Sequence, residues 1–382
     1  MPPATMASDG ELQPLLRPHR PAEVMRDPTV VHALRRWCQD QPDKRLYTWL
    51  DHKGDEEQVW SYRDLERRAD AICHALLQQW GCQRGDRVAL MYMPGLDFIA
   101  AFFGCLCAGV TAVPVYPVDL RNFESGVDKF GRIVASCSAK LVLSHTSYLH
   151  MKALHAAKNF FIGSGSWPDG LEFKATDDLE PREQRATEYE PSPDELAFLQ
   201  FTSGSTGDPK GVMLSHGNIV HNVGTIASEL GDWVPQTTVG VSWVPQYHDM
   251  GLIGVILMTL YWGSFTVLMS PITMLQNPLI WLKACDKYKA HITCGMDGLY
   301  AHAAKKIPDA AVQALDLSSL HVCMSGGEPV RFETIEAFSN KFAPAGLQRG
   351  ACFPCLGMAE NGARPCVILL DTVISQTASC VQ

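Results

Sequence analysis

Predicted helices and strands alternate along most of this chain, and this order limits the folds that it can adopt. A helix is predicted over residues 61–80, where Ser61 can cap the start, Asp64 lies three positions later and Gly81 ends the pattern. Its buried stripe consists of Leu65, Ala69, Ile72 and Leu76. A mainly apolar strand is predicted directly after it, over residues 87–92.

The same order repeats through the rest of the chain. Residues 96–108 and 130–136 predict helices, and each precedes a predicted strand, at 111–115 and 141–144. Beyond a polar connector at 176–193, strands are predicted near Val239, Phe265, Ile292 and Val322, with helices near Ile219, Leu252, Pro278 and Phe332. Such alternation builds parallel sheets through right-handed crossovers. We therefore expect an α/β fold with two packed, mostly parallel sheets flanked by helices, and a ligand cleft near the carboxyl ends of the strands.

Length and local composition predict the domain boundaries. A chain of 382 residues is long enough for two or three domains or subdomains. Residues 1–28 are Pro-rich and polar and lack the layout of a signal peptide, so we expect a flexible leader there. Residues 29–360 then form one α/β unit, divided into two subdomains near 180–193.

Net charge and cysteine usage limit the possible functions of the protein and the compartments in which it can reside. The formal net charge of −9 argues against a general nucleic-acid binder, because such proteins neutralise phosphates with Lys and Arg. The 13 cysteines follow no disulfide spacing and many lie in apolar runs, which indicates a reducing compartment, the cytoplasm. Cys352 and Cys355 have C-x-x-C spacing, but no second pair completes a zinc set, so a structural role is the preferred interpretation over metal or redox chemistry.

Two long apolar stretches, 98–117 and 250–269, have the composition of membrane spans. Glycines interrupt both, and each divides naturally into a helix, a turn and a β-branched strand. We expect buried helix–strand units and no transmembrane segment, since large α/β proteins bury such runs. A fragment of a membrane transporter is the alternative interpretation of these stretches.

A loop of small hydroxyl residues and glycines follows the strand predicted at Leu196–Leu199. It comprises Thr202, Ser203, Gly204, Ser205, Thr206 and Gly207, and Lys210 follows after the Asp208–Pro209 turn. Small residues let backbone N–H groups surround an anion, and Lys210 adds positive charge, so the segment predicts a phosphate-binding loop. It is not a Walker A motif, since Pro209 precedes Lys210 and Gly211 follows it. A flexible linker is the alternative, disfavoured by the apolar segments on both sides.

Residues 196–222 resemble the phosphate-loop signature of adenylate-forming enzymes, a superfamily of acyl-CoA synthetases, peptide-synthetase adenylation domains, luciferases and fatty acyl-AMP ligases. Residues 86–117, 243–252, 257–282 and 325–330 are similar to segments of the fatty acyl-AMP ligases. The resemblance implies that a medium- or long-chain fatty carboxylate attacks the α-phosphorus of ATP, giving acyl-AMP and pyrophosphate with the help of Mg²⁺. It also implies transfer of the acyl group to CoA or to a thiol of an acyl carrier protein or polyketide synthase.

The resemblance assigns roles to individual residues. Residues 202–207 and Lys210 would hold the ATP phosphates, and His248 and Lys210 would act at the reaction centre. The adenine would contact Gly326, Gly327, Glu328, Pro329, Leu356 and Gly357, the acyl pocket would contain Trp243, Tyr247, Asp249 and Met250, and Mg²⁺ would bind Thr206 and Glu360. From the residues alone, His248 is more often structural, Asp249 can cap the following helix and Glu360 is a solvated carboxylate.

Three departures from the family pattern leave a second interpretation open. Leu356 replaces an aromatic residue, residues 293–300 differ from the usual acyl-pocket segment, and residues 361–382 match nothing in the family. The family's C-terminal domain, with its catalytic lysine, is therefore expected to be absent, and loss of its charge at the α-phosphate would impair turnover. The alternative function is a catalytically impaired module that binds nucleotide or acyl-adenylate.

Overall fold

The alternation of strands and helices produces two sheets. The structure, a computed structural model, describes residues 26–119, 122–159, 167–202, 209–230 and 237–357. Its strands are β1 (Arg45–Leu50), β2 (Glu56–Ser61), β3 (Arg87–Met91), β4 (Thr111–Val115), β5 (Leu141–Ser144), β6 (Glu172–Ala175), β7 (Leu196–Thr202), β8 (Lys210–Ser215), β9 (Val239–Ser242), β10 (Phe265–Met269), β11 (Ile292–Gly295), β12 (Val322–Ser325) and β13 (Cys352–Pro354).

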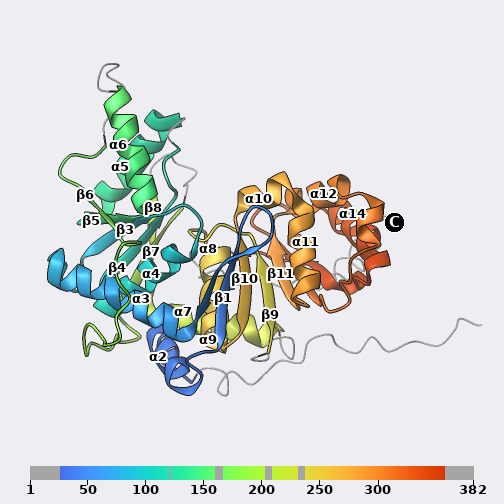
Figure 1. The fold of residues 1–382 in the computed structure, drawn as a ribbon, viewed down its shortest axis with the longest axis horizontal. Helices are drawn as coiled ribbons and strands as arrows, with labels where there is room; N and C mark the ends of the chain where they lie inside the picture. Colours follow the sequence, from blue (N-terminus) through green and yellow to red (C-terminus); the bar gives the residue numbers. More distant parts are fainter. Residues whose placement is uncertain (1–25, 120–121, 160–166, 203–208, 231–236, 358–382) are drawn as a thin grey trace, which may run out of the picture.

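The first sheet has the strand order β6-β5-β3-β4-β7-β8, and the second has the order β13-β12-β11-β9-β10-β1-β2. They stand side by side as two lobes (Figure 1). Among the described strand pairs, β1–β2 and β7–β8 are antiparallel and the others are parallel. The prediction of two mostly parallel sheets in an α/β fold is therefore confirmed.

Helices cover the outer faces of both sheets and fill the space between them. They are α2 (Val30–Asp40), α3 (Tyr62–His74), α4 (Leu96–Ala108), α5 (Phe123–Cys137), α6 (Thr146–Asn159), α7 (His216–Leu230), α8 (Asp249–Gly251), α9 (Met258–Trp262), α10 (Pro271–Gln276), α11 (Pro278–Lys287), α12 (Asp297–Lys306), α13 (Asp309–Val312) and α14 (Phe332–Phe342), with π-helical turns η1 (Ala75–Gln79) and η4 (Leu252–Leu257) and 3₁₀ turns η5 (Ala343–Ala345) and η6 (Arg349–Ala351). Figure 1 shows α5 and α6 on the first lobe, and α11, α12 and α14 on the outer side of the second.

Helix α3 starts as its sequence predicts. The Ser61 hydroxyl accepts a hydrogen bond from the Asp64 N–H at 3.2 Å, and the Asp64 carboxylate accepts one from the Ser61 N–H at 2.8 Å. This capping box satisfies two N–H groups that the helix leaves unpaired. The helix continues through η1 to Trp80, which agrees with the predicted end.

The strands do not divide between the sheets at the connector near residues 180–193. Strands β1 and β2 precede the connector, yet β1 pairs with β10 in the second sheet. Strands β7 and β8 follow it, yet Phe198 of β7 pairs with Ala112 of β4 in the first sheet. Apolar pattern shows that a strand is buried but does not identify its neighbour, which is why the exchange was not predicted.

The N-terminal boundary also differs. Asp27, which the sequence analysis placed in the leader, is buried and accepts hydrogen bonds from the Arg36 guanidinium at 2.8 and 2.9 Å. Its N–H donates to the Tyr261 hydroxyl at 3.3 Å. The packed unit therefore begins before Val30, while residues 1–25 lie outside the described part of the chain.

One apolar core joins the two sheets. It contains Val88 and Ala112 from the first sheet and Val241 and Val267 from the second. Each of the two apolar stretches forms a helical segment followed by a buried strand, α4 with β4 and η4–α9 with β10, as predicted. In the part of the chain that the structure describes, no helix has the length and apolar character needed to span a bilayer.

Candidate functional site

A cleft of about 1300 Å³ opens where the carboxyl ends of strands from both sheets meet. Tyr116 follows β4, Thr202 ends β7, and Gly327 lies beyond β12. Tyr247 and His248 enter from the segment between β9 and α8. Because parallel strands all end on this side, the fold gathers residues that are far apart in the sequence, and the predicted position of the cleft agrees with the structure.

Most of the predicted site residues that can be described line this cleft. They are Thr202, Lys210, Tyr247, His248, Asp249, Gly327, Glu328, Pro329, Leu356 and Gly357. Six predicted residues, Ser203, Gly204, Ser205, Thr206, Gly207 and Glu360, lie outside the described residues. Met250 lines a smaller adjoining cavity, whereas Gly326, the residue before Gly327, lines neither that cavity nor the cleft.

Trp243 does not reach the cleft. Its side chain is fully buried and packs edge-on against Trp281, with ring centroids 5.9 Å apart. The sequence placed it in the acyl pocket because it stands in the same motif as Tyr247. An aromatic residue beside a ligand and one in the core have the same sequence signal, so this residue was assigned to the wrong environment.

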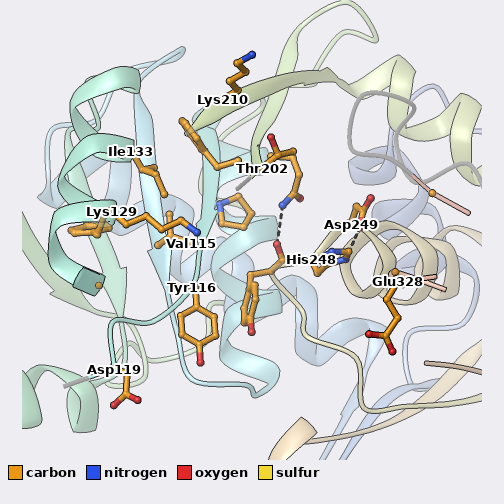
Figure 2. A pocket seen from close by; sticks show the side chains of 18 of the residues that line it. Val115, Tyr116, Asp119, Lys129, Ile133, Thr202, Lys210, His248, Asp249 and Glu328 are labelled. Atoms are coloured by element: carbon orange, nitrogen blue, oxygen red, sulfur yellow. Dashed lines mark hydrogen bonds and ion pairs between the residues drawn. The ribbon is translucent and has the colours of Figure 1, made fainter. Parts of the chain in front are cut away.

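Antiparallel pairing brings Lys210 next to Thr202. These two residues are register partners at the end of the β7–β8 ladder. Figure 2 shows Lys210 farther from the middle of the cleft than Thr202, with its ammonium group pointing away from the other labelled residues. The Gln200 amide donates to the Tyr247 carbonyl at 2.9 Å and so links β7 to the His248 segment. A cation and a hydroxyl therefore stand together on this wall, as binding of a phosphate group requires.

His248 and Asp249 form an ion pair on the facing wall. Nδ1 of His248 lies 2.5 Å from Oδ1 of Asp249, and the same carboxylate oxygen accepts from the Met250 N–H at 2.8 Å. The hydrogen bond to Asp249 raises the pKa of His248, against the opposing effect of burial. Burial acts to raise the pKa of Asp249, but its bond to His248 and the histidine charge outweigh this effect and lower it. The pair therefore favours a protonated imidazole beside the cleft (Figure 2).

A tight turn after β12 forms another part of the wall. Gly326 donates its N–H to the Gly295 carbonyl at 2.9 Å, and a Cβ at position 326 would lie 2.5 Å from the Cys355 carbonyl oxygen. Gly327 has φ +79°, a left-handed conformation that glycine adopts without strain. The Glu328 carboxylate accepts from the Gly298 N–H at 2.6 Å. The two glycines thus keep backbone close to the cleft, which suits contact with a flat base.

An ion pair that sequence reasoning missed holds this turn in place. Asp297, at the first position of α12, accepts from the Arg331 N–H at 3.0 Å and from the Arg331 guanidinium at 2.8 Å. The Thr334 hydroxyl also donates to this carboxylate, at 3.1 Å. Asp297 is only 1% exposed. No local sequence signal connects residues 34 positions apart, so this anchor had to be seen in three dimensions.

Several other cleft residues were not predicted, among them Tyr116 and Lys129. Tyr116 packs edge-on against Tyr247, with ring centroids 5.1 Å apart, although its side chain is 62% exposed. Its position directly after a buried strand was a usable signal. Lys129 of α5 points toward the middle of the cleft in Figure 2. An isolated lysine on a helix carries no comparable signal, since most such residues are solvated.

Among the described residues, no group of three His, Cys, Asp or Glu side chains is arranged to hold a metal ion. Cys352 and Cys355, which are described residues, belong to no such group, and both carry free thiols. Both residues expected to bind Mg²⁺, Thr206 and Glu360, lie outside the described ranges. The described side chains therefore do not by themselves form a magnesium site, and Mg²⁺ binding stays a prediction.

Known proteins resemble this chain over nearly its whole described length. A family model described as "AMP-binding enzyme" matches residues 34–377. The medium-chain-fatty-acid–[acyl-carrier-protein] ligase JamA of Moorena producens is 33% identical over 339 residues. A 4-hydroxyphenylalkanoate adenylyltransferase of Mycobacterium tuberculosis is 30% identical over 342 residues. The crystal structure of a fatty acyl-adenylate ligase from L. pneumophila, in complex with acyl adenylate and pyrophosphate, superposes with a TM-score of 0.77 at 36% identity.

These matches cover most of this chain but only part of each relative. They include 87% of this chain and 55% of JamA, and 88% of this chain and 54% of the adenylyltransferase. For the L. pneumophila ligase, the shares are 88% of this chain and 56% of that chain. This chain thus spans about half the length of the relatives that it matches.

Proposed function

Because the chain belongs to the family of AMP-binding enzymes, we propose that its cleft joins a fatty acid to ATP as an acyl-adenylate. A carboxylate oxygen would attack the α-phosphorus, forming a new P–O bond. The bond from that phosphorus to the oxygen bridging to the β-phosphate would break, and pyrophosphate would leave with the electron pair. The observation that carries this proposal is the meeting of Lys210, Thr202, His248 and the Gly326–Gly327 turn around one cleft.

Each wall would have a separate task. Thr202 and Lys210 would bind the outgoing phosphates, because a hydroxyl and a flexible cation suit anionic oxygens. The turn at Gly327 would receive the adenine. His248, whose pKa is raised by its hydrogen bond to Asp249, would in its protonated form donate a hydrogen bond to an anionic oxygen of the carboxylate or of the pyrophosphate. Charge that is fixed before reaction stabilises the transition state without reorganisation.

We further infer that the acyl group passes to a carrier-protein thiol in the cytoplasm. Support for the acceptor comes from relatives such as JamA, whose name describes a ligase that acts on acyl carrier protein. Support for a reducing compartment comes from the cysteines that the structure describes, all of which have free thiols. CoA is the other thiol that the assay must include.

Release of pyrophosphate tests the central step. The purified full chain is incubated with ATP, Mg²⁺ and a panel of straight-chain acids, from butanoic to hexadecanoic acid. We expect release that depends on both ATP and acid, and formation of a hydroxamate when hydroxylamine traps the adenylate. Absence of release with every acid rejects catalysis by this chain. Calorimetric binding of an acyl-sulfamoyl adenosine in that case would instead support a module that binds the adenylate without forming it.

A further inference from the structure

Two small cavities follow one another from the cleft into the second sheet, and neighbouring cavities share lining residues. The first is an inner cavity of about 40 Å³, which shares His248, Asp249 and Gly327 with the cleft. An end cavity of about 30 Å³ lies beyond it and reaches Thr238 and Ser264, just before β9 and β10 begin. Both cavities exceed the roughly 10–15 Å³ that one water molecule needs. The two cavities therefore lie in line between the carboxyl ends of these strands and their amino ends.

Three residues border both cavities. These are Gly254 from η4, Cys294 from β11 and Met324 from β12. A ligand that extended from the inner cavity into the end cavity would therefore lie beside these three residues. Met324 is one of three methionines that line these cavities, with Met250 and Met258, and their flexible side chains can move aside for a guest.

Gly254 presents a bare surface to these cavities. A Cβ built at position 254 has no heavy atom within 4 Å, so the space beside it is open. The neighbouring residues in the same helical segment are buried: Leu252 and Ile253 are 0% exposed, and Val255 is 8% exposed. The residue lies in a π-helical segment, in which the Met258 N–H bonds to the Ile253 carbonyl five positions earlier. Such segments are frequent at functional sites.

The end cavity suits an apolar guest although several hydroxyl residues line it. The hydroxyls of Thr259 and Thr266 bond to each other at 2.7 Å. The Thr293 hydroxyl donates to the Val241 carbonyl at 2.8 Å and accepts from the Trp281 ring N–H at 2.9 Å. These hydroxyls already have partners, so a polar guest would gain little from them and would lose its own hydration.

We propose that Gly254 is the gate that sets how long an acyl chain this protein accepts. The carboxyl end stays at His248, and the unsubstituted alkyl tail passes Gly254 and ends in the end cavity. This inference rests on the proposed function and adds the residue that selects among its acids. A side chain at position 254 would fill the open space and stop the tail at the inner cavity.

The test measures binding of acyl-sulfamoyl adenosines with butanoyl, octanoyl and dodecanoyl tails to the full chain by calorimetry. The variants are Gly254→Ala and Gly254→Leu. Gly131→Leu on α5 is the matched control, since Gly131 is also a helical glycine, does not line the cleft and has only an ordinary contact at 3.7 Å. A thermal melt of each variant establishes that it is folded.

We expect Gly254→Leu to bind the butanoyl analogue with unchanged affinity and to bind the dodecanoyl analogue about tenfold or more weakly. A loss of this size is typical when one methylene group no longer fits an apolar pocket. Gly254→Ala should give a smaller loss, and it decides the question if the leucine variant does not fold. Gly131→Leu should leave the length profile unchanged. A 12-hydroxydodecanoyl analogue should bind the unaltered chain more weakly than dodecanoyl.

Two results would overturn the inference, and they differ from failure of the proposed function. If substitutions at Gly254 lower affinity equally for all tails, or not at all, Gly254 is no gate. If the hydroxyl-tipped analogue binds as well as dodecanoyl, the end cavity is not an apolar terminus. If the unaltered, folded chain binds no analogue of any length, the proposed function itself fails and this inference fails with it.

Discussion

Replacement of Asp297 by alanine should destabilise the protein and weaken the site together. The Asp297 carboxylate is 1% exposed and accepts hydrogen bonds from the Arg331 N–H, the Arg331 guanidinium and the Thr334 hydroxyl. Without it, the backbone N–H and the hydroxyl lose their acceptor, at roughly 1–3 kcal/mol each. Arg331 is 62% exposed and can be rehydrated, which keeps the loss below that of a fully buried pair. We expect the free energy of unfolding to fall by about 3 kcal/mol.

Chemical denaturation of the full chain measures this loss, with Asp309→Ala as the control. Asp309 also begins a helix, α13, and pairs with Lys341, but its side chain is 87% exposed. Solvent screens such an exposed ion pair, so Asp309→Ala should change the free energy of unfolding little. Asp297→Ala should also weaken binding of an acyl-sulfamoyl adenosine, because Arg331 lies two residues beyond the turn that would receive the adenine. Equal denaturation midpoints for the two variants would refute the anchoring role of Asp297.

Three other perturbations test separate parts of the site. Lys210→Ala should weaken ATP binding by about ten- to a hundredfold in a nucleotide titration, because one charge-assisted hydrogen bond is lost; unchanged binding would remove Lys210 from the phosphate wall. Gly326→Ala places a Cβ 2.5 Å from the Cys355 carbonyl oxygen, so chemical denaturation should show that the free energy of unfolding falls by about 1–3 kcal/mol. An unchanged free energy of unfolding would mean that the turn has room for the Cβ. The raised pKa of His248 stabilises the fold below the ordinary histidine pKa, and the lowered pKa of Asp249 does so above the ordinary aspartate pKa. His248→Gln should therefore lower the unfolding midpoint more at about pH 5.5 than at about pH 9, and a pH-independent difference would contradict the ion pair.

Local sequence signals predicted the elements of this fold well. The bounds of α4 and β4 agree with those expected from apolar pattern and glycine positions. The start of α3 was readable because Ser61 and Asp64 interact within one turn. Helix α5 was predicted to begin at residue 130 but begins at Phe123, since Gly126 and nearby polar residues obscure its first two turns.

Features that depend on long-range pairing were not predictable. The exchange of β1 and β2 into the second sheet depends on pairing with β10, more than 200 positions later. Trp243 was expected beside the acyl chain and lies instead against Trp281. The Asp297–Arg331 anchor and the open space beside Gly254 likewise arise from tertiary packing. Sequence pattern therefore indicated which motifs form a site, and the fold decided which of their side chains reach it.

A structure of the full chain with dodecanoyl-sulfamoyl adenosine bound is the most direct test of the account. We predict that the sulfamoyl group lies in the cleft beside His248, between Thr202 and Gly327, with the adenine against the Gly326–Pro329 turn. The acyl tail should leave past Met250. A ligand bound elsewhere, or a folded protein that does not bind it at all, would contradict the assignment of this cleft to acyl-adenylate.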